Sequence, residues 1–185
     1  MTTPIIVLAG PSGVGKSTVV RWVCDHDPHV WFSVSATTRA SRPGEVDGEN
    51  YHFVSRERFE QMIANNDFLE WAEYAGNLYG TPLQPLLDHQ AQGRPVLLEI
   101  ELQGVRQVRE RLPQAQLVFL APPSWEDLVA RLNGRGTEDP AVVEHRLATA
   151  REEMAAQGEF HTVVVNSTVE SAGQALIDLL ETRTK

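Results

Sequence analysis

The sequence has little cysteine, few basic residues and no long hydrophobic run. Its single cysteine, Cys24, has no partner for an internal disulfide. Lysine and arginine number 16 against 25 acidic residues, and the resulting net charge of -9 argues against a general nucleic-acid binder. No stretch approaches the ~20 apolar residues of a membrane helix, and the N-terminal MTTPIIVLAGPSG turns polar too early for a signal peptide. We therefore expect a cytoplasmic protein that binds neither nucleic acid nor membrane.

The 185 residues contain short apolar runs of strand length that alternate with segments of helical period. With 42% hydrophobic residues, the chain is long enough for one sizeable core, and it shows no internal repeat or low-complexity tract. Near-continuous apolar strands separated by helices are typical of a parallel sheet covered on both faces, which indicates an α/β fold. The five predicted strands are Ile5–Ala9, Phe32–Ala36, Val96–Ile100, Leu117–Leu120 and Val163–Val165.

Residues that begin or end helices agree with this pattern. Ser55 and Ser124 precede helical segments as expected N-caps, and Asp127 follows Ser124 at the capping-box distance. Gly93 and Gly158 are expected helix ends.

The alternation breaks in two places. Between about Arg39 and Leu83, an alternating segment, a helix candidate and the stretch FLEWAEYAGNLYGTP predict a small mixed α/β insertion suited to substrate recognition. We expect Phe68 and Trp71 to belong to the core of this insertion. The glycine-bearing stretch LNGRGTED predicts a mobile lid. We thus divide a single domain into a core (1–36, 84–130 and 159–185), an insertion (about 37–83) and a helical lid (about 131–158).

The strongest local motif is GPSGVGKS, Gly10 to Ser17, which fits G-x-x-x-x-G-K-[ST] and lies between a predicted strand and a predicted helix. Its glycines allow backbone N–H groups to approach phosphate oxygens, and the following helix contributes the positive end of its dipole. Lys16 can reach the transferred phosphate and the Ser17 hydroxyl can bind magnesium. The motif predicts a nucleoside triphosphate site but does not separate a kinase from a GTPase or a mechanical ATPase.

A second phosphate site is suggested by SATTRASRPGE, in which Arg39 and Arg42 are three positions apart. Two arginines in an extended loop can converge on one dianion, although an ordinary solvated loop remains an alternative. The hydroxyls of Tyr51 and Tyr79 can also reach a phosphate, while Glu70 and Thr81 can read the edge of a base, the carboxylate accepting two N–H bonds from a guanine. Two phosphate sites in one chain indicate transfer of phosphate between them.

Six segments together carry a resemblance to a known family. The segments GPSGVGKST, SATTRASRPGEVDGENYHFVS, FLEWAEYAGNLYGT, LEIELQGV, RLNGRGTED and VVVN, in this order and at these spacings, resemble guanylate kinases over essentially the whole chain. The resemblance implies a P-loop NTPase fold with a five-stranded parallel sheet, a nucleotide-binding insertion and a lid. It also implies transfer of the γ-phosphate of Mg-ATP to GMP, and to dGMP, in purine metabolism.

The resemblance further implies a role for each matching residue. Ser35, Glu70 and Thr81 would contact guanine, four residues would hold the GMP phosphate, and Glu45 would orient the arginine loop; the four are Arg39, Arg42, Tyr51 and Tyr79. Glu99 would approach GMP, and Ser17 and Glu101 would hold Mg²⁺, partly through water. The implied ATP-binding residues are Gly10, Pro11, Ser12, Gly13, Val14, Gly15, Lys16, Ser17, Thr18, Arg131, Arg135 and Asn166. The implied catalytic residues are Lys16, Arg39, Arg135 and Arg146; for Arg131 and Arg146 a solvated helix arginine is the alternative.

Two residues depart from the family pattern. Glu101 stands where aspartate is usual, and Pro82 follows Thr81 where a small polar residue is usual. Two other functions stay open from sequence: a non-catalytic guanylate-kinase-like binding module, and a kinase of the same fold with another acceptor, such as a ribose bisphosphate. A ribose bisphosphate kinase would not need the paired base contacts of Ser35 and Glu70, so a Glu70→Gln change should leave it active but impair a GMP enzyme. The sequence does not fix the oligomeric state.

Overall fold

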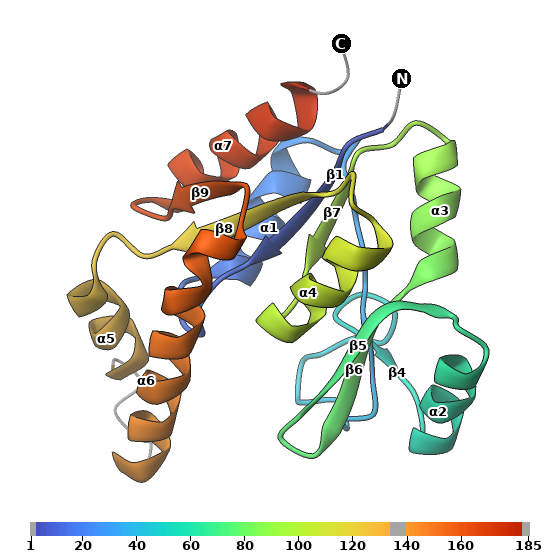
Figure 1. The fold of residues 1–185 in the computed structure, drawn as a ribbon, viewed down its shortest axis with the longest axis horizontal. Helices are drawn as coiled ribbons and strands as arrows, with labels where there is room; N and C mark the ends of the chain where they lie inside the picture. The colour runs from blue at the N-terminus through green and yellow to red at the C-terminus, as the bar shows by residue number, and fades with distance from the viewer. Residues whose placement is uncertain (1–2, 134–139, 183–185) are drawn as a thin grey trace.

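Five strands pair in parallel to form the central sheet of the computed structural model, which describes residues 3–133 and 140–182 (Figure 1). Val7 of the central strand lies opposite Leu98 on one side and Leu117 on the other. The sheet confirms the predicted α/β class. Its strands, in spatial order, are β2 (Trp31–Phe32), β7 (Val96–Glu99), β1 (Ile5–Ala9), β8 (Gln116–Ala121) and β9 (Thr162–Val165).

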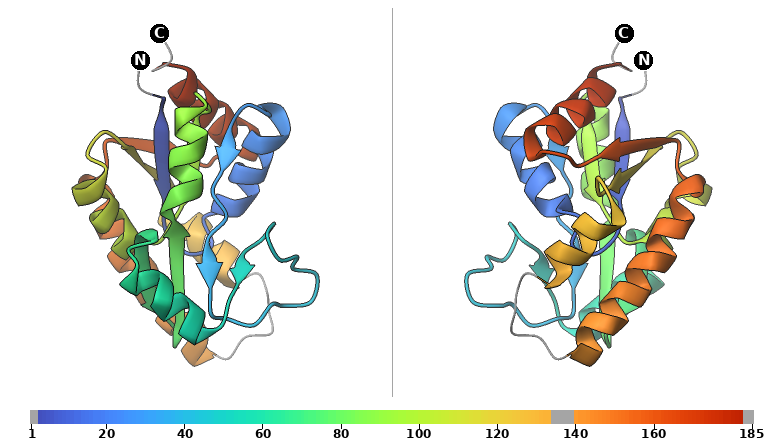
Figure 2. Two further views of the ribbon diagram at one scale, coloured as in Figure 1. Left: turned by 90° about the vertical axis from the view of Figure 1, so that its right-hand side faces the viewer. Right: turned by 90° about the vertical axis from the view of Figure 1, so that its left-hand side faces the viewer.

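Helices cover both faces of this sheet, which explains why its strands are apolar without alternation. Ile6 and Leu8 of β1 pack on one side, with α1 (Lys16–His26), α5 (Trp125–Asn133) and α7 (Val169–Thr182). Ile5 and Val7 pack on the other side, with α3 (Leu83–Ala91) and α4 (Leu102–Arg111). Figure 2 shows α3 and α7 on opposite sides of the strands.

A second, mixed sheet is formed by the segment predicted as an insertion. Its strands, in spatial order, are β4 (His52–Phe53), β3 (Ala36–Thr37), β6 (Asn77–Pro82) and β5 (Phe68–Tyr74). The pair β3 and β4 is parallel, whereas β6 is antiparallel to both β3 and β5. The helix α2 (Arg56–Ala64) packs on this sheet through Phe59, whose ring stacks on that of Phe68 with centroids 4.3 Å apart. Phe68 is therefore core, as predicted, but Trp71 is 38% exposed, and its assignment to the core was wrong.

The strands β5 and β6 form a hairpin with a tight turn at one end and a bulge at the other. Tyr74 lies opposite Asn77, so only Ala75 and Gly76 form the turn, with φ values of 50° and 77°. Positive φ at both positions is the geometry of a type I′ hairpin turn. The register shifts between Phe68 and Glu70, where a β-bulge interrupts the ladder.

One predicted strand, Phe32–Ala36, was wrong in extent. Trp31 and Phe32 pair with β7 of the central sheet, whereas Ala36 and Thr37 pair with β6 of the second sheet. The chain crosses between the sheets over residues 33–35. The sequence pattern continues through this crossing because the half-buried Phe32 and the buried Ala36 both pack in a sheet, so periodicity does not reveal the crossing.

The helix ends follow the capping residues at most predicted positions. Ser55 accepts a hydrogen bond from the N–H of Arg58 at 3.1 Å, and Ser124 accepts one from the N–H of Asp127 at 3.0 Å. Gly93, at φ 75°, follows the C-cap of α3. Gly158 does not end α6 (Pro140–Ala155); it lies within the following 3₁₀ turn η1 (Ala156–Glu159). In the described part of the chain, no helix combines the length and the hydropathy needed to span a membrane.

Candidate active site

The phosphate loop connects β1 to α1 and leaves the N-terminus of that helix open. Gly15 is the N-cap of α1 at φ 98°, a left-handed conformation that favours glycine, and no described side chain caps the helix there. The first N–H groups of a helix have no internal partner and favour an anion. Lys16 Nζ donates a hydrogen bond to the carbonyl of Gly10 at 2.7 Å, so the lysine lies folded back along the loop.

Two of the predicted ATP-binding residues hold this loop through its backbone. Arg131 Nη1 and Asn166 Nδ2 both donate to the carbonyl of Val14, at 3.0 and 2.8 Å. Arg131 Nη2 also donates to the carbonyl of Asn166 at 3.2 Å, and Asn166 is only 4% exposed. The structure thus brings Arg131 and Asn166 together at the phosphate loop, while Arg146 lies half-buried on α6 and Arg135 lies outside the described residues.

A further residue at the loop, Glu153, was missed from sequence. Its Oε2 accepts a hydrogen bond from the backbone N–H of Ser12 at 3.0 Å, in the loop where phosphate oxygens are expected. Burial raises the pKa of Glu153, and the N–H of Ser12 and the charge of Lys16 oppose that rise. Glu153 follows Arg146 by two helical turns on α6, so the shared helix face was a signal that could have identified it.

Ser17 and Glu99 form a pair of oxygen donors beside the loop. Ser17 Oγ donates to Glu99 Oε1 at 3.0 Å, so Glu99 lies at the serine predicted to bind magnesium. Burial raises the pKa of Glu99, while Lys16 and the hydrogen bond from Ser17 lower it. Glu101 is the exposed N-cap residue of α4. A hydroxyl and two carboxylates suit Mg²⁺, a hard cation that prefers oxygen ligands.

The arginine loop is organised around Glu45. Arg39 donates through Nη1 and Nη2 to the two carboxylate oxygens of Glu45 at 2.9 and 2.8 Å, and the N–H of Arg42 donates to the same group at 2.7 Å. These bonds lower the pKa of Glu45 to about 2. The guanidinium carbon of Arg39 lies 5.3 Å from the centre of the Tyr51 ring, and the Tyr51 and Tyr79 ring centroids are 6.0 Å apart. The structure therefore brings Arg39, Tyr51 and Tyr79 together, whereas the side chain of Arg42 is exposed.

A buried carboxylate stands at the end predicted to read a base. Glu70 is 5% exposed, and its Oε1 accepts a hydrogen bond from Thr81 Oγ1 at 2.6 Å across the β5–β6 ladder. Burial is the main cause that raises the pKa of Glu70, and the hydrogen bonds from Thr81 act against it. A carboxylate held away from water in this way is suited to accept hydrogen bonds from a ligand.

One cavity of about 1050 Å³ joins these groups. Ser17 and Thr18, in the first turn of α1 directly after the phosphate loop, line it, and so does every residue predicted for GMP except Thr81, which donates a hydrogen bond to Glu70. The same cavity is lined by Glu101. The arrangement therefore places the start of α1, a cationic loop and a buried hydrogen-bond acceptor around a single space.

Comparisons with known proteins identify the family of the chain. A family model described as guanylate kinase matches residues 2–183. Guanylate kinases of Streptomyces coelicolor and Corynebacterium jeikeium are each 58% identical to the chain, over 95% of it and over 89% and 95% of their own lengths. The crystal structure of guanylate kinase from Anaplasma phagocytophilum superposes with a TM-score of 0.81 at 32% identity, covering 98% of this chain and 86% of that one. On these grounds the chain belongs to the guanylate kinase family.

Proposed function

We propose that the protein transfers the γ-phosphate of ATP to GMP, giving ADP and GDP, in the cytoplasm. The observation that carries this proposal is the single cavity that joins Ser17, in the first turn of α1 beside the phosphate loop, to the Arg39 loop and to the buried Glu70. A donor and an acceptor bound in one cavity can meet in line, which is the main requirement of phosphoryl transfer. Family membership supports the same acceptor and disfavours a binding module or a ribose bisphosphate kinase.

ATP is assigned to the loop between β1 and α1. Backbone N–H groups of residues 12–18 and the open N-terminus of α1 would hold its phosphates, and Lys16 would leave the carbonyl of Gly10 to reach the transferred group. Arg131 and Asn166 would fix the loop from behind through Val14. Arg135 and Arg146 of the proposed lid would add positive charge as it closes, and that closure would exclude water as a competing acceptor.

GMP is assigned to the second sheet and the arginine loop. Arg39 and Arg42, with Tyr51 and Tyr79, would hold the phosphate, and Glu45 would orient the arginines through the bonds described above. Glu70 would accept hydrogen bonds from guanine, supported by Thr81 and by Ser35 in the same cavity. Thr81 already donates to one carboxylate oxygen, which leaves Oε2 and the remaining lone pairs for the base.

Mg²⁺ is assigned to the space beside Ser17. Ser17, Glu99 and Glu101 would hold the ion, partly through water, and the bond between Ser17 and Glu99 supports Glu99 as a member of this set. When bound, the ion would neutralise charge on the phosphates. Lys16 contributes positive charge from the protein side of the same region.

The division of the chain follows from these assignments. We propose a core of residues 1–36, 84–130 and 159–185, a GMP-binding insertion of about 37–83 and a lid of about 131–158. The separate second sheet, with its own cluster around Phe59 and Phe68, supports the insertion as one unit.

The experiment that tests the function measures ADP formation from Mg-ATP with one acceptor at a time. The acceptors are GMP, AMP, CMP, UMP and a ribose bisphosphate, and a Lys16→Ala protein serves as the blank. We expect strong turnover with GMP alone. Turnover with the ribose bisphosphate, or none with any acceptor in a folded protein that binds ATP, would reject the proposal.

A further inference from the structure

We infer that one face of α4, formed by Gly104, Gln107 and Arg111, positions Glu70 and thereby sets the selectivity for guanine. We call these three residues the α4 row. The inference rests on the proposed function, because Glu70 is taken to read the base. It concerns positioning residues, since the row acts on the base only through Glu70.

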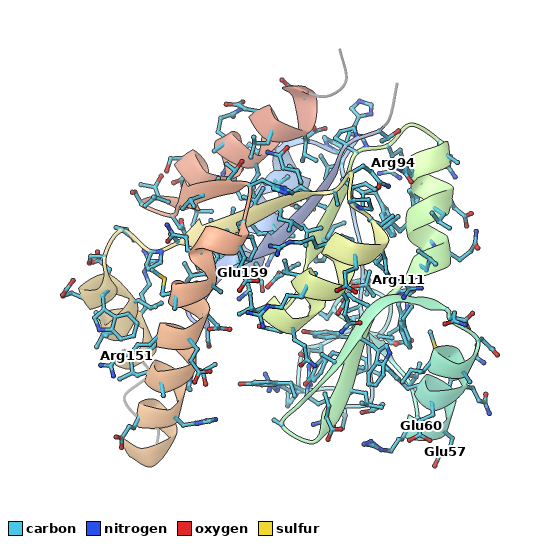
Figure 3. All side chains as sticks on the ribbon, in the orientation of Figure 1. Glu57, Glu60, Arg94, Arg111, Arg151 and Glu159 are labelled. Carbon is cyan, nitrogen blue, oxygen red and sulfur yellow. The ribbon has the colours of Figure 1, made fainter. Side chains whose placement is uncertain are left out.

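The row lies against an edge strand. In the described part of the chain, β5 is the outer strand of the second sheet, so the outward N–H and C=O groups of its backbone need partners from elsewhere. Figure 3 shows Arg111 where α4 meets β5. Residues spaced by three and four positions share one face of a helix, which brings Gly104, Gln107 and Arg111 to the same side.

Gln107 pairs with the peptide groups on both sides of one residue of β5. Its Nε2 donates to the carbonyl of Trp71 at 2.7 Å, and its Oε1 accepts from the N–H of Trp71 at 3.2 Å. A side-chain amide thus takes the place of a neighbouring strand at the residue directly after Glu70. These two bonds fix the position and the orientation of the backbone at Trp71 relative to α4.

Arg111 holds the backbone directly before Glu70. Its Nη1 donates to the carbonyls of Phe68 and Leu69, at 2.6 and 2.9 Å. Successive carbonyls of a regular strand point to opposite sides, so one nitrogen reaches both only because the bulge between Phe68 and Glu70 breaks the alternation. Bulges re-aim side chains, and here the arginine stabilises the bulge that turns Glu70 into the cavity.

Gly104 leaves space for the carboxylate itself. A Cβ at this position would lie 3.0 Å from Cδ of Glu70 and would collide with its Oε2. The helix therefore approaches the carboxylate directly and limits its movement on that side. Glu70 is thus held by Thr81 in front, by α4 behind and by anchored peptides before and after it in the chain.

The other side of α4 binds Glu159 and not β5. Arg106 donates to both carboxylate oxygens of Glu159 at 3.0 and 2.6 Å, and Arg109 donates to the carbonyl of Glu159, beyond the end of α6. Figure 3 shows Glu159 on that side of the helix. Arg106 is therefore a matched control for Arg111, since the same substitution on the same helix leaves β5 untouched.

The test compares GMP with inosine monophosphate, which lacks the 2-amino group and so offers Glu70 one N–H fewer. We expect Gln107→Ala and Arg111→Met each to lower the ratio of kcat/KM for GMP over inosine monophosphate about tenfold, mainly through KM for GMP. KM for ATP should stay within about twofold. Arg106→Met should leave the ratio unchanged, and Arg111→Lys, which keeps a donor, should restore most of it.

An unchanged ratio in both Gln107→Ala and Arg111→Met would overturn the inference, even if their unfolding midpoints fall. If one of the two does not fold, the other variant and Arg111→Lys decide the matter. If the wild-type protein does not phosphorylate GMP, the proposed function fails. The row is then tested separately by the ratio of the dissociation constants for GMP and inosine monophosphate, measured by calorimetry.

Discussion

Under the proposed function, the two ends of the site would recognise their ligands with different parts of the chain. At the phosphate end, the groups that would face a ligand are backbone N–H groups of one contiguous segment at the start of α1. At the base end, the groups are side chains of separate segments, with Glu70 and Thr81 on paired strands and Ser35 in the crossing between the sheets. Backbone recognition suits a phosphate, which every nucleotide carries, whereas side chains are needed to tell one base from another.

The two ends also differ in how they are held in place. The phosphate loop is fixed from behind by the bonds of Arg131 and Asn166 to the carbonyl of Val14. The end around Glu70 depends on α4, which packs on the central sheet and hydrogen-bonds to β5, the outer strand of the second sheet. A defect at the first end should therefore affect phosphate transfer in general, while a defect at the second should affect the choice of acceptor.

Loss of Lys16 should have the largest effect on turnover, and this effect should be confined to the phosphate end. We expect Lys16→Ala to lower kcat with GMP by about 10³-fold, because under the proposed function the lysine would supply positive charge to the transferred phosphate. GMP binding, measured by calorimetry, should remain close to that of the wild type, since the base end is intact. A variant that keeps high turnover would show that Lys16 does not reach the phosphate.

Loss of the Glu70 charge should have the opposite selectivity: it should weaken the use of GMP and leave ATP binding unchanged. We expect Glu70→Gln to lower kcat/KM for GMP about 10²-fold with KM for ATP unchanged, because an amide cannot accept both N–H bonds of guanine. The matched control is Glu73→Gln, the same change at an exposed position of the same strand. Equal losses in the two variants would point to a general effect on β5 instead.

Substitution of Glu153 tests whether a protein carboxylate competes with the triphosphate for the N–H groups of the phosphate loop. Its carboxylate occupies the N–H of Ser12 and lies near Lys16, so it should oppose the charge of an incoming triphosphate. We expect Glu153→Gln to lower the dissociation constant of ATP by about three- to tenfold, while that of GMP stays constant. Glu152→Gln, exposed on the same helix, is the control. Weaker ATP binding in Glu153→Gln would mean that this carboxylate helps to shape the loop.

The smallest effect should come from the pH dependence of the arginine loop. Because Arg39 lowers the pKa of Glu45 from 4.5 to about 2, their ion pair is complete above pH 4.5 and is lost as the pH falls toward 2. The difference in urea midpoint between the wild type and Glu45→Gln should thus be small and constant from pH 7 to about 4.5, and should shrink below it. A difference that grows in acid would contradict this assignment.

Sequence reasoning recovered the features that local patterns encode. The apolar strands, the caps at Ser55 and Ser124 and the phosphate loop each occupy a continuous stretch, so their residues report directly on their structure. The crossing after Phe32 was misjudged because a strand that changes sheets keeps an apolar pattern throughout.

The remaining features depend on contacts between distant segments. Gln107 and Arg111 look like ordinary polar residues of an amphipathic helix, and only the docking of α4 on β5 reveals their partners. The bulge beside Glu70 leaves no mark in the sequence, because it is a mismatch in length between two strands. Glu153 shares its helix face with Arg146, but its bond to Ser12 joins segments on opposite halves of the chain.

The two-residue turn at Ala75 and Gly76 has a consequence for how the chain reaches its fold. The β5–β6 hairpin pairs residues close in sequence, so it can form within microseconds of becoming available. The strand β1 is made first during synthesis, yet its partners β7 and β8 follow only after the whole second sheet. Such non-local pairing is slow, and the edges of β1 stay unpaired until β7 and β8 are available. We therefore expect the β5–β6 hairpin of the second sheet to fold early, and the phosphate loop that follows β1 to be among the last parts to acquire its native shape.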